Sequence, residues 1–129
     1  MPVLTMNPTL GDLLKLELQR SYCRETVTLK AGASYPLGAV LGKITASGKY
    51  RLSPNATVTG DKGAETAIAV LLEAADATAA DTTGLIAARG PVIVSKAQLA
   101  FDGSVNDAAK TTAKHTQLAA AGLVARETA

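Results

Sequence analysis

Aromatic residues are scarce in this chain of 129 residues, which has three tyrosines, one phenylalanine and no tryptophan. So few rings cannot form a stacking platform for single-stranded nucleic acid. The net charge of +2 likewise gives no strong electrostatic attraction to nucleic acid. The core must therefore be built from valine, leucine, isoleucine and alanine. A core of such small side chains often gains stability when the protein forms oligomers.

Cysteine and histidine are also scarce, with one residue of each. The single cysteine, Cys23, excludes an intrachain disulfide and fits a protein made in a reducing compartment. One cysteine and one histidine do not make a zinc site of the usual kind. We therefore expect neither a metal ion nor an organic cofactor.

Long apolar segments are missing as well. The N-terminus has no charged leader followed by an apolar run, so no signal peptide is predicted. The longest uninterrupted apolar run, residues 67–72, is far too short to cross a membrane. We therefore expect no membrane partner.

Four side chains are candidates for catalysis, and none has the sequence context that a catalytic site requires. His115 falls within a predicted helix without an orienting group close by in the sequence, so a surface histidine is expected. Cys23 lacks a papain-like pattern around it, and a packed thiol is expected. Asp61 and Glu65 lie in "GDKGAE", where solvated loop carboxylates are expected. The sequence therefore predicts a protein that is not an enzyme.

Two loops resemble ligand-binding motifs but fail on spacing. A phosphate-binding loop needs four residues between its glycines and a hydroxyl after its lysine, whereas Gly38 and Gly42 are separated by three residues and Lys43 is followed by Ile44. The segment "DGSVND", residues 102–107, lacks the alternating ligands, the sixth-position glycine and the distal glutamate of a calcium loop. Neither nucleotide nor calcium binding is predicted.

The segment "YPLGAVLGKITASGKY", residues 35–50, is punctuated by glycines and carries no reactive side chain. Its valine, leucine and isoleucine residues favour a strand, and Gly38 and Gly42 relieve crowding where backbones approach closely. Gly48 supplies the positive φ of a tight turn, after which "KYRLS" returns as a second strand. The pattern predicts a β-hairpin in which Gly38, Gly42 and Gly48 are structural turn residues.

Three further segments predict strands. Residues 24–32 alternate apolar and polar side chains, which is typical of a half-buried strand. Residues 66–78 indicate a buried strand, and residues 84–95 another that is broken at Gly90 and Pro91 by a bend or at a sheet edge.

The two ends of the chain differ from this β-rich middle. Residues 1–11 contain Pro2 and Pro8, which favour an extended arm. In "DLLKLELQR", residues 12–20, the leucines fit both a helical and an alternating spacing, and we prefer a short helical turn. A late helix is predicted to be capped by Asn106 and terminated by Gly122. Its apolar stripe is expected to hold Ala109, Ala113, Leu118 and Ala121, with Leu123 and Val124 packing beyond it.

The order of these segments resembles the bacteriophage head decoration proteins, the relatives of phage lambda's protein D. The resemblance covers residues 22–126 and rests on "YCRETVTLKAG", "PLGAVLGKITASGKY", "AIAVLLEAADA", "RGPVIV" and "LAAAGLVARE" in that order. Its most specific pieces are residues 38–42, the triplet Gly48-Lys49-Tyr50, and Arg89 with Gly90.

This resemblance implies a mainly β fold of the β-clip kind, with one C-terminal helix and an extended N-terminal arm. It implies a homotrimer that binds the major capsid protein on the outer surface of an expanded phage head and stabilises the head against the pressure of packaged DNA. The protein would be made in the bacterial host cytoplasm and reside in the virion. Residues 1–21 would form a capsid-binding arm and residues 22–129 the decoration domain.

The arm is expected to supply contacts to the capsid. Val3, Leu4 and Met6 have no evident place in the core of the domain, so they are expected to bury on the shell. An extended arm can also add a strand to an exposed sheet edge of its partner, because main-chain hydrogen bonds make little demand on side chains.

Two other functions stay open at the level of sequence. One is a trimeric β-clip enzyme of the nucleotide pyrophosphatase type, which needs acidic metal-binding motifs and a glycine-rich tail. The tail here, "LVARETA", has neither glycine nor an aromatic residue. The other is a module that binds a peptide or a glycan.

Overall fold

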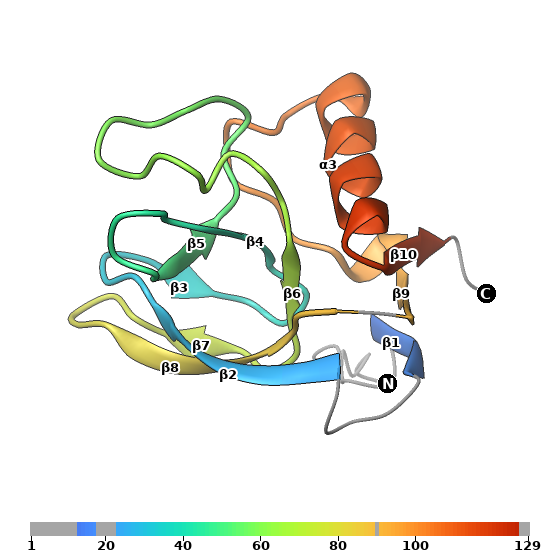
Figure 1. The fold of residues 1–129 in the computed structure, drawn as a ribbon, viewed down its shortest axis with the longest axis horizontal. Helices are drawn as coiled ribbons and strands as arrows, with labels where there is room; N and C mark the ends of the chain where they lie inside the picture. Colours follow the sequence, from blue (N-terminus) through green and yellow to red (C-terminus); the bar gives the residue numbers. More distant parts are fainter. Residues whose placement is uncertain (1–12, 18–22, 90, 127–129) are drawn as a thin grey trace, which may run out of the picture.

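A computed structural model describes residues 13–17, 23–89 and 91–126. Most of the described elements are short strands, and one longer helix follows them near the C-terminus (Figure 1). In chain order they are β1 (Leu14–Glu17), β2 (Arg24–Leu29), β3 (Ser34–Tyr35), β4 (Val40–Lys43), β5 (Tyr50–Leu52), β6 (Ala69–Leu71), β7 (Ala75–Asp76), β8 (Thr82–Ala87), β9 (Val92–Ser95), the 3₁₀ turn η1 (Lys96–Gln98), α3 (Ala108–Ala120) and β10 (Leu123–Arg126).

The larger part of the fold is a small closed barrel with strand order β2-β5-β4-β6-β8. Its interior is filled by a cluster of buried side chains that includes Leu29, Leu41 and Leu71. A Cβ atom on Gly84 would lie 2.7 Å from Leu29 Cδ1, so a glycine in β8 leaves the room that this leucine occupies. The barrel is thus filled by side chains, as expected for so few strands.

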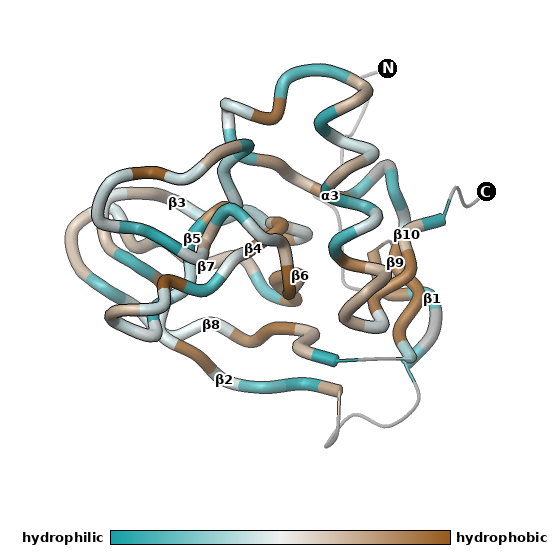
Figure 2. Tube along the Cα trace, turned by 45° about the horizontal axis from the view of Figure 1, so that its top comes forward, coloured by the Kyte–Doolittle hydropathy of each residue, from teal (hydrophilic) through white to brown (hydrophobic). Residues whose placement is uncertain are grey.

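A separate sheet with order β1-β9-β10 lies beside the barrel, and α3 packs against it (Figure 1). Strand β9 pairs antiparallel with β1 and parallel with β10. Val92, Val94 and Leu123 are buried together with Leu118 of the helix in a second core cluster. Figure 2 shows hydrophobic positions concentrated on this sheet and on β6, while many of the loops are hydrophilic or neutral.

The expected mainly β fold with a C-terminal helix is confirmed. The predicted hairpin is also confirmed, because β4 and β5 pair antiparallel with Leu41 opposite Leu52. The strand predicted over residues 84–95 divides into β8 of the barrel and β9 of the separate sheet. Between Ala87, where β8 ends, and Val92, where β9 begins, the chain therefore passes from one sheet to the other; Gly90 of the predicted break lies outside the described residues.

The helical turn preferred over residues 12–20 is wrong where the structure describes this segment, because Leu14–Glu17 form strand β1. Strand β1 contains a bulge between Leu14 and Leu16, so its register against β9 shifts by a residue. The alternating leucines were the better guide, since pairing with β9 supplies the backbone hydrogen bonds that a lone helical turn would lack.

Two expectations about the helix are corrected. Its N-cap is Asp107, whose side chain accepts a hydrogen bond from the backbone N–H of Lys110, whereas the Asn106 side chain accepts one from Lys110 Nζ at 3.0 Å. The predicted stripe is displaced, because Ala109 and Ala113 are exposed while Lys114 and Leu118 are the buried helix residues. A long lysine stem fills the space that small alanines cannot reach.

The end of the helix follows the prediction, while the residues beyond it follow it only in part. Gly122 has a φ of +89° and donates its N–H to the carbonyl of Ala119, which ends the helix as expected. Leu123 is buried as predicted, but Val124 is 37% exposed, because successive residues of strand β10 face opposite sides of the sheet.

Candidate functional site

The three glycines predicted as structural turn residues lie at close backbone approaches or in a turn. Gly48 has a φ of +73° in the β4–β5 connection, where its N–H donates to the Ile44 carbonyl at 2.8 Å. A Cβ on Gly38 would lie 2.0 Å from the Gln98 carbonyl oxygen, and one on Gly42 would lie 2.0 Å from that of Ala64. Gly42 lies within strand β4 itself. These glycines position strands and carry no ligand chemistry.

Residues 53–67 form a long irregular segment that is fastened to the barrel by a buried carboxylate. Asp61 is 3% exposed, and its carboxylate accepts hydrogen bonds from Lys30 Nζ at 2.6 Å and from Arg51 Nη1 at 2.7 Å. The hydrogen bond from Lys30 is the largest influence holding the pKa of Asp61 below its usual value. The prediction that Asp61 is a solvated carboxylate is therefore wrong. The side chain is buried because it pairs with Lys30, just beyond β2, and with Arg51 in β5.

The same segment is fastened to the helix by a buried lysine. Lys114 is 2% exposed, and its ammonium donates to Ser53 Oγ at 2.9 Å and to the carbonyl oxygens of Pro54 and Glu65, each at 2.6 Å. Burial lowers the pKa of Lys114. Helix α3 thus holds both ends of the segment through one side chain. The sequence signal was the i,i+4 spacing of Lys114 and Leu118, which places both on one helix face.

Glu65 shapes the segment from within. Its carboxylate accepts hydrogen bonds from the N–H of Gly63 at 2.7 Å and from Thr57 Oγ1 at 3.2 Å. Hydrogen bonding lowers the pKa of Glu65, the largest influence being its own backbone N–H. Asp61 and Glu65 therefore act separately, one as an anchor and the other as a local brace, and do not form an acid–base pair.

The remaining reactive side chains are placed in packing roles. Cys23 is fully buried in the core cluster beneath the sheet, as a packed thiol should be. His115 is half-buried rather than on the surface, with its ring 5.8 Å from that of Phe101, and its buried Nε2 atom has no hydrogen-bond partner. Burial, followed by the charge of Lys96, lowers the pKa of His115. Without an orienting partner this imidazole is not arranged as a general base.

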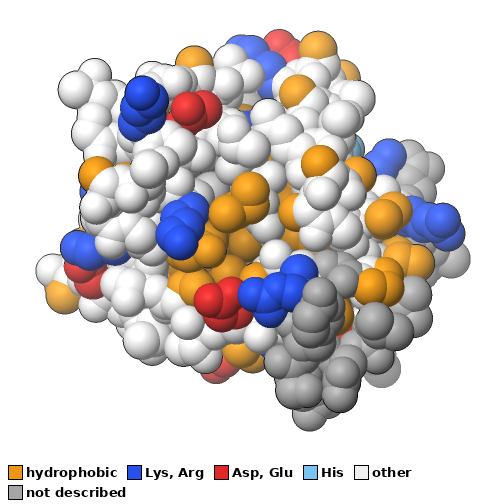
Figure 3. Space-filling model, viewed as in Figure 1, with side chains coloured by type: hydrophobic (Ala, Val, Ile, Leu, Met, Phe, Trp, Pro, Cys, Tyr) orange, Lys and Arg blue, Asp and Glu red, His pale blue; other side chains and the backbone are white. Residues whose placement is uncertain are grey.

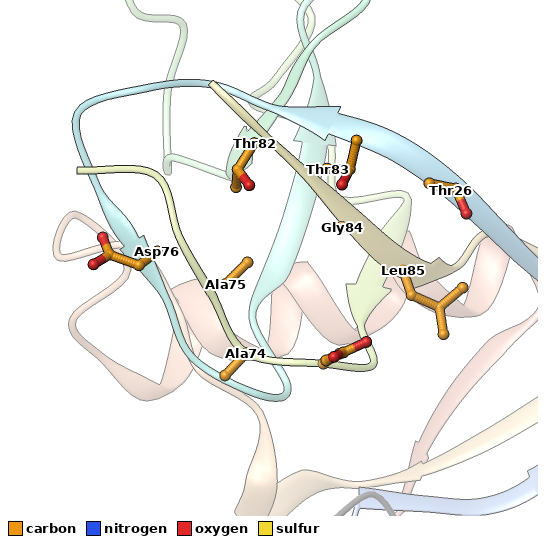
Figure 4. Close-up of a pocket in the computed structure, with 9 residues that line it drawn as sticks. Thr26, Ala74, Ala75, Asp76, Thr82, Thr83, Gly84 and Leu85 are labelled. Carbon is orange, nitrogen blue, oxygen red and sulfur yellow. The ribbon is translucent and has the colours of Figure 1, made fainter. Parts of the chain in front are cut away.

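A hollow lies between β8 and the segment that leads into β7 (Figure 4). It has a volume of about 470 Å³ and is lined by Thr26, Glu73, Ala74, Ala75, Asp76, Thr82, Thr83, Gly84 and Leu85. The Asp76 side chain points away from it in Figure 4 and accepts a hydrogen bond from the N–H of Thr78 at 3.0 Å. Such a lining combines small and hydroxyl side chains with two carboxylates, and supplies neither a cation nor an aromatic face for recognising a ligand.

Within residues 13–17, 23–89 and 91–126, histidine, cysteine and acidic side chains form no group of three or more that could hold a metal ion. In the same part of the chain, no helix has the length and apolar character needed to span a membrane.

Apolar side chains of the described residues reach the surface in several parts of the fold. The barrel interior is bordered by partly buried Val27, Leu52, Ile68 and Ala88, and Figure 3 shows apolar side chains at the centre of the face over the barrel. Among the described large hydrophobic residues, Val58 and Val124 are exposed, each to 37%. Val58 belongs to the irregular segment 53–67, and Val124 belongs to β10 at the edge of the separate sheet.

The predicted capsid-contacting residues Val3, Leu4 and Met6 lie outside the described residues. Leu13, which directly precedes β1, is fully buried in the core cluster under the β1-β9-β10 sheet.

Comparison with known proteins identifies a family. Residues 3–123 match the family model described as bacteriophage lambda head decoration protein D. A search of the curated proteins found no match for the chain.

Proposed function

The chain belongs to the bacteriophage lambda head decoration protein D family, and on this basis we propose that it binds as a homotrimer to the outer surface of an expanded phage head. Membership makes it a structural protein of the phage capsid, with a role in decorating and stabilising the head, and not an enzyme. We propose that the stabilisation opposes the internal pressure of packaged DNA.

The observation that carries this proposal is the length of the family match, which spans residues 3–123 of 129. Two features of the structure support a structural role. The long segment 53–67 is held in place by Asp61 and Lys114. The carboxylates of Asp61 and Glu65 in this segment accept hydrogen bonds from within the protein. The nucleotide pyrophosphatase alternative has no support from the family, and peptide or glycan binding stays a hypothesis.

The partner in this proposal is the major capsid protein, and the N-terminal arm supplies much of the grip. Val3, Leu4 and Met6 would bury on the shell, which is worth roughly 4–8 kcal/mol before the cost of ordering the arm. A trimer engages through three arms, so a weak contact per arm gives firm attachment at high effective concentration. The division into an arm of residues 1–21 and a domain of residues 22–129 stays a prediction, and β1 lies within the first range.

A binding experiment with expanded heads that lack decoration protein tests this function. The full chain should sediment with the heads and raise the temperature at which they break. A chain lacking residues 2–11 should remain a folded oligomer and bind much more weakly. The heads are assembled from the major capsid protein that is encoded beside this chain. If the full chain does not bind these expanded heads, the proposed function is wrong. If the truncated chain binds as well as the full chain, only the role of the arm is wrong.

A further inference from the structure

Strand β8 has an open edge beside the hollow that Figure 4 shows. On one side of β8, strand β2 pairs with it along its whole length. On the other side, strand β6 pairs only with Ile86 and Ala87. One further hydrogen bond, from the Leu72 N–H to the Leu85 carbonyl at 2.8 Å, continues this contact before the chain turns away toward β7. Among the described strands, residues 82–84 therefore have a neighbour on one side only.

The register shows which backbone groups of this edge are free to pair. In an antiparallel ladder, alternate residues bond to the partner strand, and the residues between them direct their N–H and C=O groups to the other side. The Ala88 N–H donates to the Cys23 carbonyl at 2.8 Å, so Gly84, four residues earlier in the same register, also faces β2. Thr83 lies next to Gly84 and therefore directs its N–H and C=O away from β2, on the side of the hollow that it lines.

Strand β7 forms the opposite wall of the hollow and has an open edge as well. Among the described strands it pairs with β3 alone. The Ala77 N–H donates to the Ala33 carbonyl at 3.0 Å, so the preceding residue, Asp76, directs its backbone N–H and C=O away from β3. Figure 4 shows the Ala75 side chain directed between the two strands and that of Asp76 directed away from the hollow. Two strand edges thus border one hollow.

The lining of the hollow suits the main chain of a peptide. Its volume is about 470 Å³, and its walls include Ala74, Ala75 and Gly84, whose small side chains leave room for a backbone. An added strand is recognised through hydrogen bonds to its backbone, so the hollow needs neither a cation nor an aromatic face for this purpose. Its ionisable lining residues are Glu73 and Asp76, both exposed, so a basic side chain on the peptide would complement the charge.

We propose that this hollow binds an extended peptide segment of another protein, which pairs with β8 through Thr83 and lies against β7 as an added strand. The segment carries small or hydroxyl-bearing side chains and one lysine or arginine, placed near Glu73 and Asp76. The added strand joins the β3-β7 ribbon to the β8-β2 wall of the barrel. This binding activity is separate from head decoration and does not rest on it.

The probes are pools of synthetic peptides added to the full chain. The first pool has about six residues, drawn from alanine, serine, threonine and valine around a central lysine, with both ends blocked. A second pool has glutamate in place of the lysine. A third pool keeps the lysine and carries methyl groups on alternate backbone nitrogens, which then cannot donate hydrogen bonds. Backbone amide signals in NMR spectra report where and how tightly each pool binds.

Two variants of the protein provide a matched pair. Ala75→Tyr places a ring in the hollow, whereas Ala79→Tyr places the same ring on an exposed alanine of the neighbouring loop, outside the lining of the hollow. Ala75→Val is a smaller obstruction for use if the tyrosine impairs folding. Circular dichroism checks the fold of each variant, and light scattering checks the number of copies in its oligomer.

We expect the lysine pool to shift the amide signals of residues 73–76 and 82–85, with a Kd on the order of 1 mM or tighter. The glutamate and N-methylated pools should bind at least about tenfold more weakly. Ala75→Tyr should abolish binding, Ala75→Val should weaken it, and Ala79→Tyr should leave it within about twofold.

Four results would overturn the proposal. One is the absence of shifts with the lysine pool at several times that concentration, and another is a set of shifts that lies elsewhere on the protein. Equal binding by the N-methylated pool would show that the backbone of the peptide is not recognised. A change in the number of copies in Ala75→Tyr, with Ala79→Tyr unchanged, would assign the hollow to a contact between copies of this chain.

Discussion

Lys114 shows how a single residue can fasten two distant segments. Its ammonium is surrounded by a hydroxyl, two backbone carbonyls and, at 3.4 Å, the amide oxygen of Gln117. The Gln117 oxygen also accepts the N–H of Ala67 at 2.8 Å, so helix and segment are bonded at both ends. Such a buried network stabilises the fold only while the Lys114 ammonium donates to each of these acceptors.

Replacing Lys114 by methionine keeps the apolar stem and removes the donor. The buried carbonyls of Pro54 and Glu65 would lose their partner, so we expect the free energy of unfolding to fall by about 2–4 kcal/mol. Urea denaturation measures the change. Lys110→Met on the same helix is the control, and its 3.9 Å ion pair with Asp107 predicts a loss below about 1 kcal/mol. Equal stability of the two variants would contradict the role assigned to Lys114.

Because the pKa of Asp61 is lowered in the fold, we expect the free energy of unfolding to decrease in acid. Its pKa is lowered in the fold relative to the ordinary value of 3.8, so the unfolded chain takes up the proton first as the pH falls. The stabilisation is therefore present above about pH 4 and is lost as the pH falls through the lower pKa of the folded state. Asp61→Asn should destabilise the protein by about 2–3 kcal/mol at pH 7 and flatten the acid limb of stability against pH.

Glu73→Gln is the matched control for Asp61→Asn, because Glu73 is exposed. It should change the free energy of unfolding by less than about 0.5 kcal/mol at pH 7. The measurement is urea denaturation at a series of pH values from neutral to acid. An acid limb that is as steep in Asp61→Asn as in the unmodified protein would show that other carboxylates carry the effect.

We expect His115 to make the stability of the fold depend on pH in a second, less acidic range. Burial and Lys96 lower its pKa below 6.5, so the unfolded chain binds a proton at His115 before the folded chain does. Stability should therefore decrease as the pH falls below 6.5, and the decrease should end near the folded pKa. His115→Phe removes the titrating imidazole and should therefore remove this slope. The new ring can keep the contact that the imidazole makes with Phe101. A slope unchanged in His115→Phe, measured by thermal unfolding between about pH 7.5 and roughly 5, would assign it to another group.

At the scale of elements, the geometry of the β4–β5 hairpin lets us predict how stability changes when its turn glycine is replaced. An added Cβ on Gly48 would meet only Lys43 Cε, at 3.9 Å, but the residue has a φ of +73°. Gly48→Val should therefore lower the free energy of unfolding by about 1–3 kcal/mol through backbone strain alone. Gly103→Ala, with no positive φ and no atom within 4 Å of its added Cβ, should be nearly neutral by urea denaturation. A neutral Gly48→Val would show that the turn readily adopts another conformation.

Elements defined by local signals were predictable from sequence. The β4–β5 hairpin was marked by its turn glycine and the late helix by its C-terminal glycine, and both signals act over a few residues. Strand β1 was not predictable, because its leucines fit two periodicities and only pairing with β9, far along the chain, decides between them. The roles of Asp61 and Lys114 depend on the same kind of distant contact. Lys30 and Arg51 reach Asp61 from distant parts of the chain, and no local pattern records that meeting.

At the scale of the whole molecule, the proposed homotrimer has a thermodynamic signature. If unfolding also separates the copies, mass action raises the Tm with protein concentration. A hundredfold increase in concentration should raise the Tm by several degrees, on the order of 5 °C for a chain of this size. Scanning calorimetry of a reversible transition measures it. A Tm that does not move with concentration would contradict coupled unfolding of an oligomer.

The attachment of β1 to β9 has a mechanical consequence for the proposed grip through the N-terminus. A pull on the N-terminal segment acts along β1, nearly at right angles to the hydrogen bonds that join β1 to β9. Force in that direction loads the bonds of the ladder together, in shear, whereas a pull across the strand would open them one after another. Leu13, fully buried at the start of β1, adds resistance because it must leave the core before the strand can slide. Under the proposed load from the packaged DNA, the connection between β1 and the rest of the fold should therefore yield later than a strand peeled from its end.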